Sequence, residues 1–207
     1  MTETRFIDDA AELRSIQARS AEEPDAGPLS VQEKAFLGHI NLRGDPDDAT
    51  FMACVTGVLG FALPTSPNTS REVMDRVACW LGPSEWLLSV PADNEQTVAA
   101  ALRDALAHAH ASVVEVGGGH VVLLLTGNRV RDLLAKGCPL DLHPSKFGAG
   151  QCAQSHLGNA PIVARAVSDG IELVVRRSFA DYVWRWLQVC AQEYGGRIDR
   201  NEARGSS

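Results

Sequence analysis

The chain has 207 residues, of which 45% are hydrophobic and 22% are charged, and its formal net charge is -7. This length and composition fit one large globular domain or two small fused domains, and they exclude a disordered or collagen-like chain. The acidic balance argues against nucleic acid and anionic membranes as main partners. The longest apolar run, Val121–Leu125, is far shorter than the roughly 18 residues that a membrane helix needs.

The N-terminal part of the chain differs from the rest. Residues 1–14 are acidic and lack a hydrophobic segment, so we expect no signal peptide and a cytoplasmic protein. The five cysteines are odd in number and irregularly spaced, as in a reduced cytosolic protein. Residues 22–28 are typical of a linker. We predict an N-terminal extension over 1–30 that is partly disordered or docks onto a partner, an α+β domain over 31–197 and a C-terminal tail over 198–207.

The first half of the domain has clear strand and helix patterns, beginning near His39. Residues 40–43 alternate and predict a strand that ends at Gly44. The acidic turn Asp45–Asp48 precedes apolar residues at helical spacing from Phe51 to Leu59, which predicts a helix with one buried face. A loop over 63–70, a hairpin over 77–81 and 86–90, and a helix over 97–108 follow.

The second half repeats these patterns less clearly. Strands are predicted over 113–116 and 121–125, on either side of a three-glycine segment. Asn128 is a candidate cap for a short helix, and residues 140–151 are irregular. A hairpin over 161–167 and 171–175 precedes a helix that extends to about Tyr194, with Ser178 and Asp181 arranged nearly as a capping box.

The order of these elements indicates an internal duplication. Two hairpins and the helices that follow them stay in phase when the sequence is shifted by about 85 positions, although the first helices of the two halves align poorly. We interpret the fold as α+β, with duplicated ferredoxin-like (split βαβ) units. A coincidental match remains the alternative.

Four potential metal ligands lie within nineteen residues of one another. Cys138, His143, Cys152 and His156 have ligand types that suit tetrahedral zinc, but no CxxC or HxxxH pair fixes two of them in advance. The same residues, with Asp141, can be drawn as a cysteine–histidine nucleophile, although nothing marks Cys152 as lying on a sharp turn. Buried cysteines and hydrogen-bonded histidines are the default interpretation.

Other polar patterns have simpler explanations than a catalytic site. Asp45, Asp47 and Asp48 resemble a carboxylate cluster for acid–base or calcium chemistry, yet helix capping accounts for them. The segment Gly117–His120 leads into a strand, so it lacks the helix N-terminus that binds phosphate. From these residues alone we expect no catalytic, cofactor-binding or metal site.

The last helix carries a feature that favours an interface. Tyr182, Val183, Trp186, Leu187 and Cys190 share one face, and Trp184 lies roughly 130° away from the centre of that face. Tryptophan is enriched at the energetic centres of protein interfaces. Burial of Trp184 by a neighbouring loop is the competing interpretation.

Three segments carry a resemblance to a known family: LGPSEWLL at 81–88, RDLLAKGCPLDLHP at 131–144 and RSFADYVWRWL at 177–187. Together they resemble the gamma subunit of heterotetrameric sarcosine oxidase, over about residues 41–196. The resemblance implies a complex with alpha, beta and delta subunits that oxidatively demethylates sarcosine to glycine. The co-product is hydrogen peroxide, and the methyl carbon leaves as formaldehyde or 5,10-methylenetetrahydrofolate.

The resemblance also implies which subunits of the complex bind the cofactors. FAD, FMN, NAD and zinc belong to the partner subunits, and the gamma chain is a non-catalytic subunit that serves assembly and stability. We expect its contacts to involve the N-terminal extension, represented by Phe6, and the last helix at Trp184 and Arg185.

The same family resembles the folate-binding fold of aminomethyltransferase, which fits a duplicated ferredoxin-like core. The sequence departs from the transferase where folate would bind. An Asp-Asp pair is replaced by Met74–Arg76, which contains Asp75, and a Val-Asn-Ala segment is replaced by Val90–Ala92. No folate residue is therefore carried over. The alternative function is a stand-alone folate-binding one-carbon protein with a relic pocket near Asp75.

Overall fold

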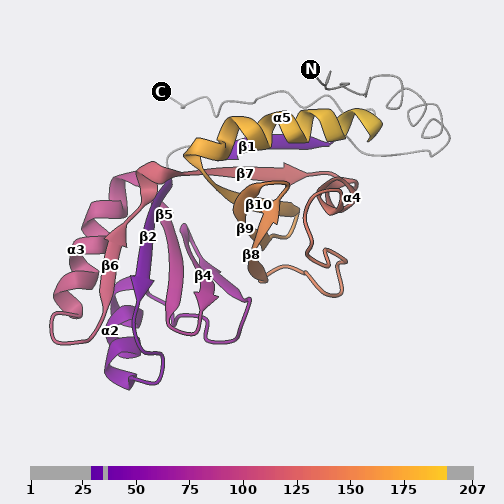
Figure 1. Ribbon diagram of the computed structural model, residues 1–207. Coiled ribbons are helices and arrows are strands. Elements are labelled where there is room, and N and C mark those ends of the chain that lie inside the picture. The colour runs from indigo at the N-terminus through magenta and orange to yellow at the C-terminus, as the bar shows by residue number, and fades with distance from the viewer. Residues whose placement is uncertain (1–28, 35–36, 195–207) are drawn as a thin grey trace, which may run out of the picture.

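The computed structural model describes residues 29–34 and 37–194, and these residues form two five-stranded antiparallel sheets (Figure 1). The sequence-based prediction of an α+β fold is thus confirmed. Most of the predicted N-terminal extension, with Phe6, and the predicted C-terminal tail lie outside the described residues.

The first sheet has the strand order β3-β4-β5-β2-β6. Alternate residues of its central strands, such as Ile40, Leu42 and Leu88, point to one face and are buried there beneath two helices. The elements are β2 at Leu37–Arg43, α2 at Ala49–Leu59, β3 at Ser70–Val73, β4 at Arg76–Gly82, β5 at Glu85–Pro91, α3 at Glu95–Ala105 and β6 at Ser112–Glu115.

Helix α2 forms as the sequence predicts. The Asp48 side chain accepts a hydrogen bond from the backbone N–H of Thr50, 2.8 Å away, and thereby caps the helix N-terminus. Gly60 ends the helix in the left-handed conformation, at φ 83°. Phe51, Val55 and Leu59 are buried on the sheet-facing side.

The second sheet has the strand order β1-β7-β10-β9-β8. Residues 171, 173 and 175 of β10 point toward its helices, whereas Glu172, Val174 and Arg176 point away from them. The elements are β1 at Ser30–Lys34, β7 at His120–Thr126, α4 at Val130–Ala135, β8 at Cys152–Leu157, β9 at Ala160–Ala166, β10 at Gly170–Arg176 and α5 at Ala180–Ala191.

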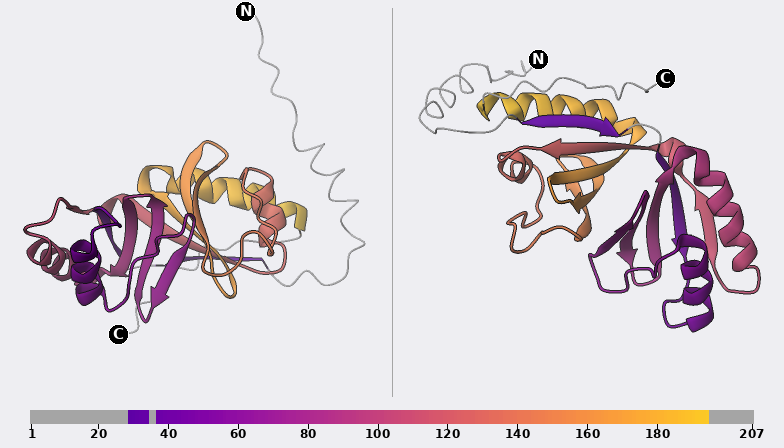
Figure 2. Two further views of the ribbon diagram at one scale, coloured as in Figure 1. Left: turned by 90° about the horizontal axis from the view of Figure 1, so that it is seen from below. Right: turned by 180° about the vertical axis from the view of Figure 1, so that it is seen from behind.

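The two sheets face each other on the sides that the helices leave uncovered (Figures 1 and 2). A small core fills the space between them; its buried members are Cys79, Leu87, Val122, Cys152 and Val174. Helices α2 and α3 lie on the outer side of the first sheet, and α4 and α5 on the outer side of the second. Each sheet therefore has one core beneath its helices and shares another with its neighbour.

The three-glycine segment carries the chain from one sheet to the other. It forms a short 3-10 turn, Gly117–Gly119, between β6 of the first sheet and β7 of the second. The Glu95 carboxylate accepts hydrogen bonds from the backbone N–H groups of Gly117, at 2.9 Å, and His39, at 3.2 Å. A Cβ atom at residue 117 would lie 2.5 Å from Glu95 Oε2, so any other residue there would displace the Glu95 carboxylate from this position.

Two predicted helix caps are wrong, and three strands were not predicted. Arg129, rather than Asn128, occupies the N-cap position of α4. Ser178 lies inside the 3-10 turn Arg177–Phe179 that precedes α5, one residue before Phe179, which occupies the N-cap position of that helix. The strands that were missed are β1, β3 and β8, and all three are sheet edges.

No helix within residues 29–34 and 37–194 is long and apolar enough to cross a bilayer.

Candidate functional site

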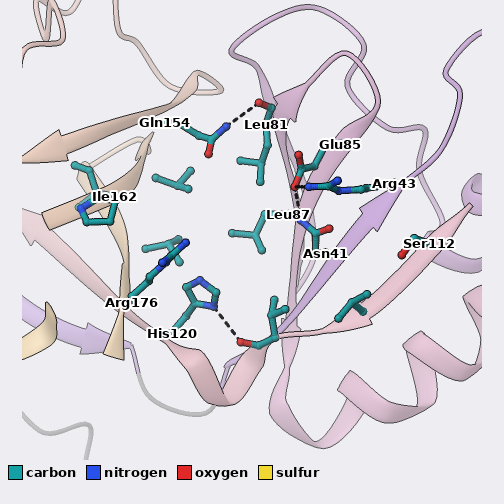
Figure 3. A pocket seen from close by; sticks show the side chains of 15 residues that line it. Asn41, Arg43, Leu81, Glu85, Leu87, Ser112, His120, Gln154, Ile162 and Arg176 are labelled. Carbon is teal, nitrogen blue, oxygen red and sulfur yellow. Dashed lines mark hydrogen bonds and ion pairs between the residues drawn. The ribbon is translucent and has the colours of Figure 1, made fainter. Parts of the chain in front are cut away.

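A cleft opens between the two sheets at the end nearest the glycine turn (Figure 3). Its volume is about 530 Å³. The first sheet contributes Asn41, Arg43 and Glu85 to its wall, and the second contributes side chains from β7 to β10. The apolar part of the lining consists of Leu81, Leu87, Val114, Val116, Pro161, Ile162, Val163 and Val174.

The polar groups of this cleft are held in place by the protein. Asn41 Nδ2 donates to Glu85 Oε1 at 2.7 Å, and Arg43 pairs with the same oxygen at 2.9 Å. Gln154 Nε2 donates to the carbonyl oxygen of Leu81 at 2.8 Å and so bridges the sheets. His120 Nδ1 lies 3.0 Å from the carbonyl oxygen of Val116. Because a carbonyl only accepts, Nδ1 carries the proton and Nε2 remains available.

A second histidine lies beside His120, away from solvent. The rings of His39 and His120 are 5.5 Å apart between centroids. His39 is 1% exposed, and neither of its ring nitrogens has a hydrogen-bond partner among the described residues. Burial, assisted by the charge of His120, lowers the pKa of His39 from 6.5 to about 4. His39 is therefore neutral at physiological pH.

Buried ionic groups occupy the opposite end of the space between the sheets. Arg165 donates to Glu172 through Nε and Nη2, at 2.8 and 2.6 Å, and to Glu72 through Nη1 at 2.7 Å. Lys34 Nζ donates to the other Glu172 oxygen at 2.6 Å. Burial would raise the pKa of Glu172, but the hydrogen bond from Lys34 and the Arg165 guanidinium hold it below its usual range.

A smaller cavity of about 290 Å³ lies against this ionic network. Asp75 and Pro91, which stand where the transferase pattern would hold folate ligands, both line it, together with Met74, Lys34 and Arg165. The positive groups of this cavity are already paired with Glu72 and Glu172. Asp75 could be identified from the sequence, whereas Arg165 and Glu172 were not predicted, although a charged residue within an apolar strand pattern is a visible signal.

The four candidate zinc ligands do not converge. Cys138 is buried in the helix-side core of the second sheet, with its Sγ 3.7 Å from Ser155 Oγ. Cys152 faces the other sheet, whereas His143 and His156 are exposed. Within residues 29–34 and 37–194, no three or more His, Cys, Asp or Glu side chains are grouped as metal ligands. His143 instead forms a turn with Ser145, 2.8 Å from its Nδ1.

The environment of Cys152 is structural as well. Its Sγ donates to the carbonyl oxygens of Thr69, at 3.1 Å, and Trp80, at 3.6 Å. A hydrogen bond with the Cys79 side chain lowers the pKa of Cys152 and raises that of Cys79. Cys152 is fully buried, and Asp141, its suggested partner, is exposed on an irregular loop. The predicted nucleophile arrangement is therefore not assembled.

Helix α5 carries an apolar groove on its outer surface. Val189 is 49% exposed and Tyr182 is 38% exposed, so the apolar surface of this helix is wider than the face that the sheet buries. Tyr182, Trp186 and Cys190, which were predicted to share one face, line the groove with Arg185, Asp181 and Val189, and Trp186 and Cys190 also pack partly against the helix-side core. Trp184 is partly buried and packs against the helix-side core of the second sheet.

Comparison with known proteins places these features in context. Residues 43–193 match the sarcosine oxidase, gamma subunit family. Over 202 residues, the chain is 28% identical to sarcosine oxidase subunit gamma from Corynebacterium sp. (strain U-96), which covers 94% of this chain and 97% of that relative.

Two solved structures resemble the fold. A chain of the heterotetrameric sarcosine oxidase from Corynebacterium sp. U-96 matches with a TM-score of 0.75 and 26% identity, over 95% of this chain and 100% of that chain. Aminomethyltransferase T of the glycine cleavage system from Bartonella henselae matches with a TM-score of 0.59 and 16% identity, over 85% of this chain and 48% of that chain. The second likeness is one of fold.

Proposed function

Because this chain belongs to the sarcosine oxidase gamma subunit family, we propose that it is the gamma subunit of a heterotetrameric sarcosine oxidase, in complex with alpha, beta and delta subunits. The observation that carries the proposal is the agreement over nearly the whole length of both chains, in sequence and in fold. The complex would convert sarcosine to glycine with hydrogen peroxide as co-product. The methyl carbon would leave as formaldehyde or 5,10-methylenetetrahydrofolate.

Within this complex, we propose a non-catalytic role for the chain in assembly and stability. The FAD, FMN, NAD and zinc of the complex are assigned to the partner subunits. The separation of Cys138, His143, Cys152 and His156 in the structure supports this division, because no nucleophile or metal site is built from them. A subunit that binds only the folded partners stabilises them by mass action.

We propose the outer groove of α5 as the contact with a partner subunit; it includes the candidate Arg185, whereas the candidate Trp184 packs against the core. Helix α3 offers an internal comparison, because it packs on the first sheet as α5 packs on the second. An offset of about 85 residues aligns exposed Val189 of α5 with exposed Asp104 of α3. Trp186 likewise aligns with Ala101. The apolar surface is therefore specific to α5 and suits the buried centre of an interface.

The test is co-purification from the native host. A tagged chain is expected to bring down three other chains and the absorbance of bound flavin, with sarcosine-dependent peroxide formation. Val189→Asp should reduce recovery of the partners at least about tenfold, the effect of losing an interface anchor worth 1.4 kcal/mol or more. Ala101→Asp introduces the same charged side chain at an exposed position of α3 and should leave recovery unchanged. A colourless chain recovered alone would contradict the proposal.

We also infer that the fold is a duplication of ferredoxin-like (split βαβ) units, as in the aminomethyltransferase fold. Equal strand orders support this inference: β6-β2-β5-β4-β3 in one sheet corresponds to β1-β7-β10-β9-β8 in the other. Helices α2 and α3 correspond to α4 and α5. The last strand of the second unit is supplied by β1. A rearranged chain with residues 29–34 moved behind α5 should therefore fold.

The alternative function, a stand-alone folate-binding one-carbon protein, is favoured by one observation: Asp75 and Pro91 line the same cavity. It is opposed by the pairing of Lys34 and Arg165 with carboxylates, which leaves no cation for the acidic tail of folate. Calorimetric titration of the full chain with tetrahydrofolate separates the two. Binding that is lost in Asp75→Asn but kept in the exposed-turn variant Asp169→Asn would support the alternative.

A further inference from the structure

The cleft between the sheets combines the size and the lining of a small-molecule site. Its volume of about 530 Å³ is in the range of pockets that enclose drug-sized ligands, roughly 300–1,000 Å³. Its wall is mostly aliphatic, and a few polar groups converge on it from both sheets (Figure 3). It lies at the opposite end of the inter-sheet core from the cavity that contains Asp75, and the two linings share only Val174.

The charge of the cleft identifies the kind of ligand. Arg43 is neutralised by Glu85 at 2.9 Å. The guanidinium of Arg176 is exposed, and it forms no ion pair or hydrogen bond with any residue in the described part of the chain. The lining therefore has two cations and one carboxylate, in a chain whose net charge is -7. An unpaired guanidinium beside an apolar wall favours one negative charge on the ligand.

The side chain beside Arg176, that of His120, is held in a fixed orientation. Residues 176 and 120 lie directly opposite each other on β10 and β7, and Figure 3 shows both side chains at the same end of the cleft. The Val116 carbonyl fixes the His120 tautomer and leaves Nε2 available. At the other end of the cleft the Leu81 carbonyl holds the Gln154 amide nitrogen, which leaves Gln154 Oε1 as an acceptor. Such groups are oriented before a ligand arrives, which lowers the entropic cost of binding.

We propose that this cleft binds a small organic monoanion, a carboxylic acid with an apolar body. The carboxylate pairs with Arg176 beside His120, and the apolar body lies against Leu87, Val163 and Val174. Multiply charged ligands such as nucleotides are disfavoured because the cleft offers a single unpaired cation. The proposal does not depend on the role of the chain in an oxidase complex, because every group in it belongs to this chain.

The experiment uses a fluorescent monoanion of matching chemistry, 1-anilinonaphthalene-8-sulfonate, titrated into the full-length chain. We expect saturable binding of one probe, and Arg176→Gln should weaken it about tenfold or more, the effect of losing 1.4 kcal/mol from a charge-assisted hydrogen bond. The uncharged analogue N-phenyl-1-naphthylamine should bind wild type and Arg176→Gln equally. Benzoate should displace the anionic probe, whereas benzamide should not.

Arg185→Gln is the matched control, because Arg185 lines a different apolar groove, on α5. Its affinity for the anionic probe should equal that of the wild type. Equal affinity of wild type and Arg176→Gln, or a loss confined to Arg185→Gln, would overturn the proposal. Amide NMR spectra of the same samples give an independent readout. Shifts at His120 and the Gln154 side chain are expected, and shifts confined to α5 would also refute the site.

Discussion

The buried neutral state of His39 makes the stability of this protein depend on pH. His39 has a folded-state pKa of about 4, against 6.5 for an unperturbed histidine. The unfolded chain therefore binds a proton more readily than the folded chain between these values. Stability is unaffected by this group above pH 6.5 and falls as the pH is lowered from 6.5 toward 4. From pH 7.5 to pH 5 the loss is about 2 kcal/mol, and below pH 4 it reaches about 3 kcal/mol.

The variant His39→Leu tests this reasoning, since leucine has a similar volume and no nitrogen left without a partner. Urea denaturation followed by tryptophan fluorescence gives the free energy of unfolding at pH 7.5 and pH 5. We expect wild type to lose about 2 kcal/mol more than His39→Leu between these pH values. His108→Gln, at an exposed histidine, should behave as the wild type. Equal losses in wild type and His39→Leu would refute the burial argument.

Three further outcomes follow from contacts described above. Glu95→Ala removes the acceptor of two backbone N–H groups and should lower the free energy of unfolding by about 2–4 kcal/mol, with exposed Asp93→Ala within about 0.5 kcal/mol of wild type in the same urea titration. Arg165→Met leaves the buried Glu172 carboxylate with only Lys34 and should cost about 3 kcal/mol, whereas adding Glu172→Met should restore part of that loss in thermal melts. Titration of the native chain with a thiol reagent should modify the partly exposed cysteines before the buried ones, and the first to react should be Cys54 and Cys190.

The strands that lie at the centre of a sheet could be predicted from the sequence, whereas three of the four edge strands could not. The central strand β10 is buried on both faces and reads as the apolar run Ile171–Val175 with one interruption. The edge strand β3, Ser70–Val73, has exposed or partly exposed side chains throughout, so its sequence shows no apolar periodicity. Such an edge strand is extended because it pairs with a neighbouring strand. The pairing involves residues elsewhere in the chain, so the sequence of the edge strand itself does not reveal it.

The candidate site was predictable to a smaller extent, because its groups come from separate strands. Arg176 and His120 are opposite each other only through the pairing of β10 with β7. Their position near Asn41 depends further on the packing of one sheet against the other. The groove of α5 lies on one helix, so helical spacing placed Tyr182, Trp186 and Cys190 together, but it did not show that Trp184 packs against the core and stays outside the groove.

The pairing of β1 with β7 has a consequence for synthesis on the ribosome. Val31 pairs with Leu125, about 90 residues later in the chain, so β1 leaves the ribosome long before its neighbour exists. The first sheet draws its strands from 37–115 and can form while the rest is still being made. The second sheet contains both the first strand of the described chain, β1, and the last ones, β7 to β10, so it cannot be completed until these last strands have been synthesised. Truncation that removes β1 would expose an edge of β7 that no other strand within residues 37–194 pairs with, which makes aggregation the expected fate of such a product.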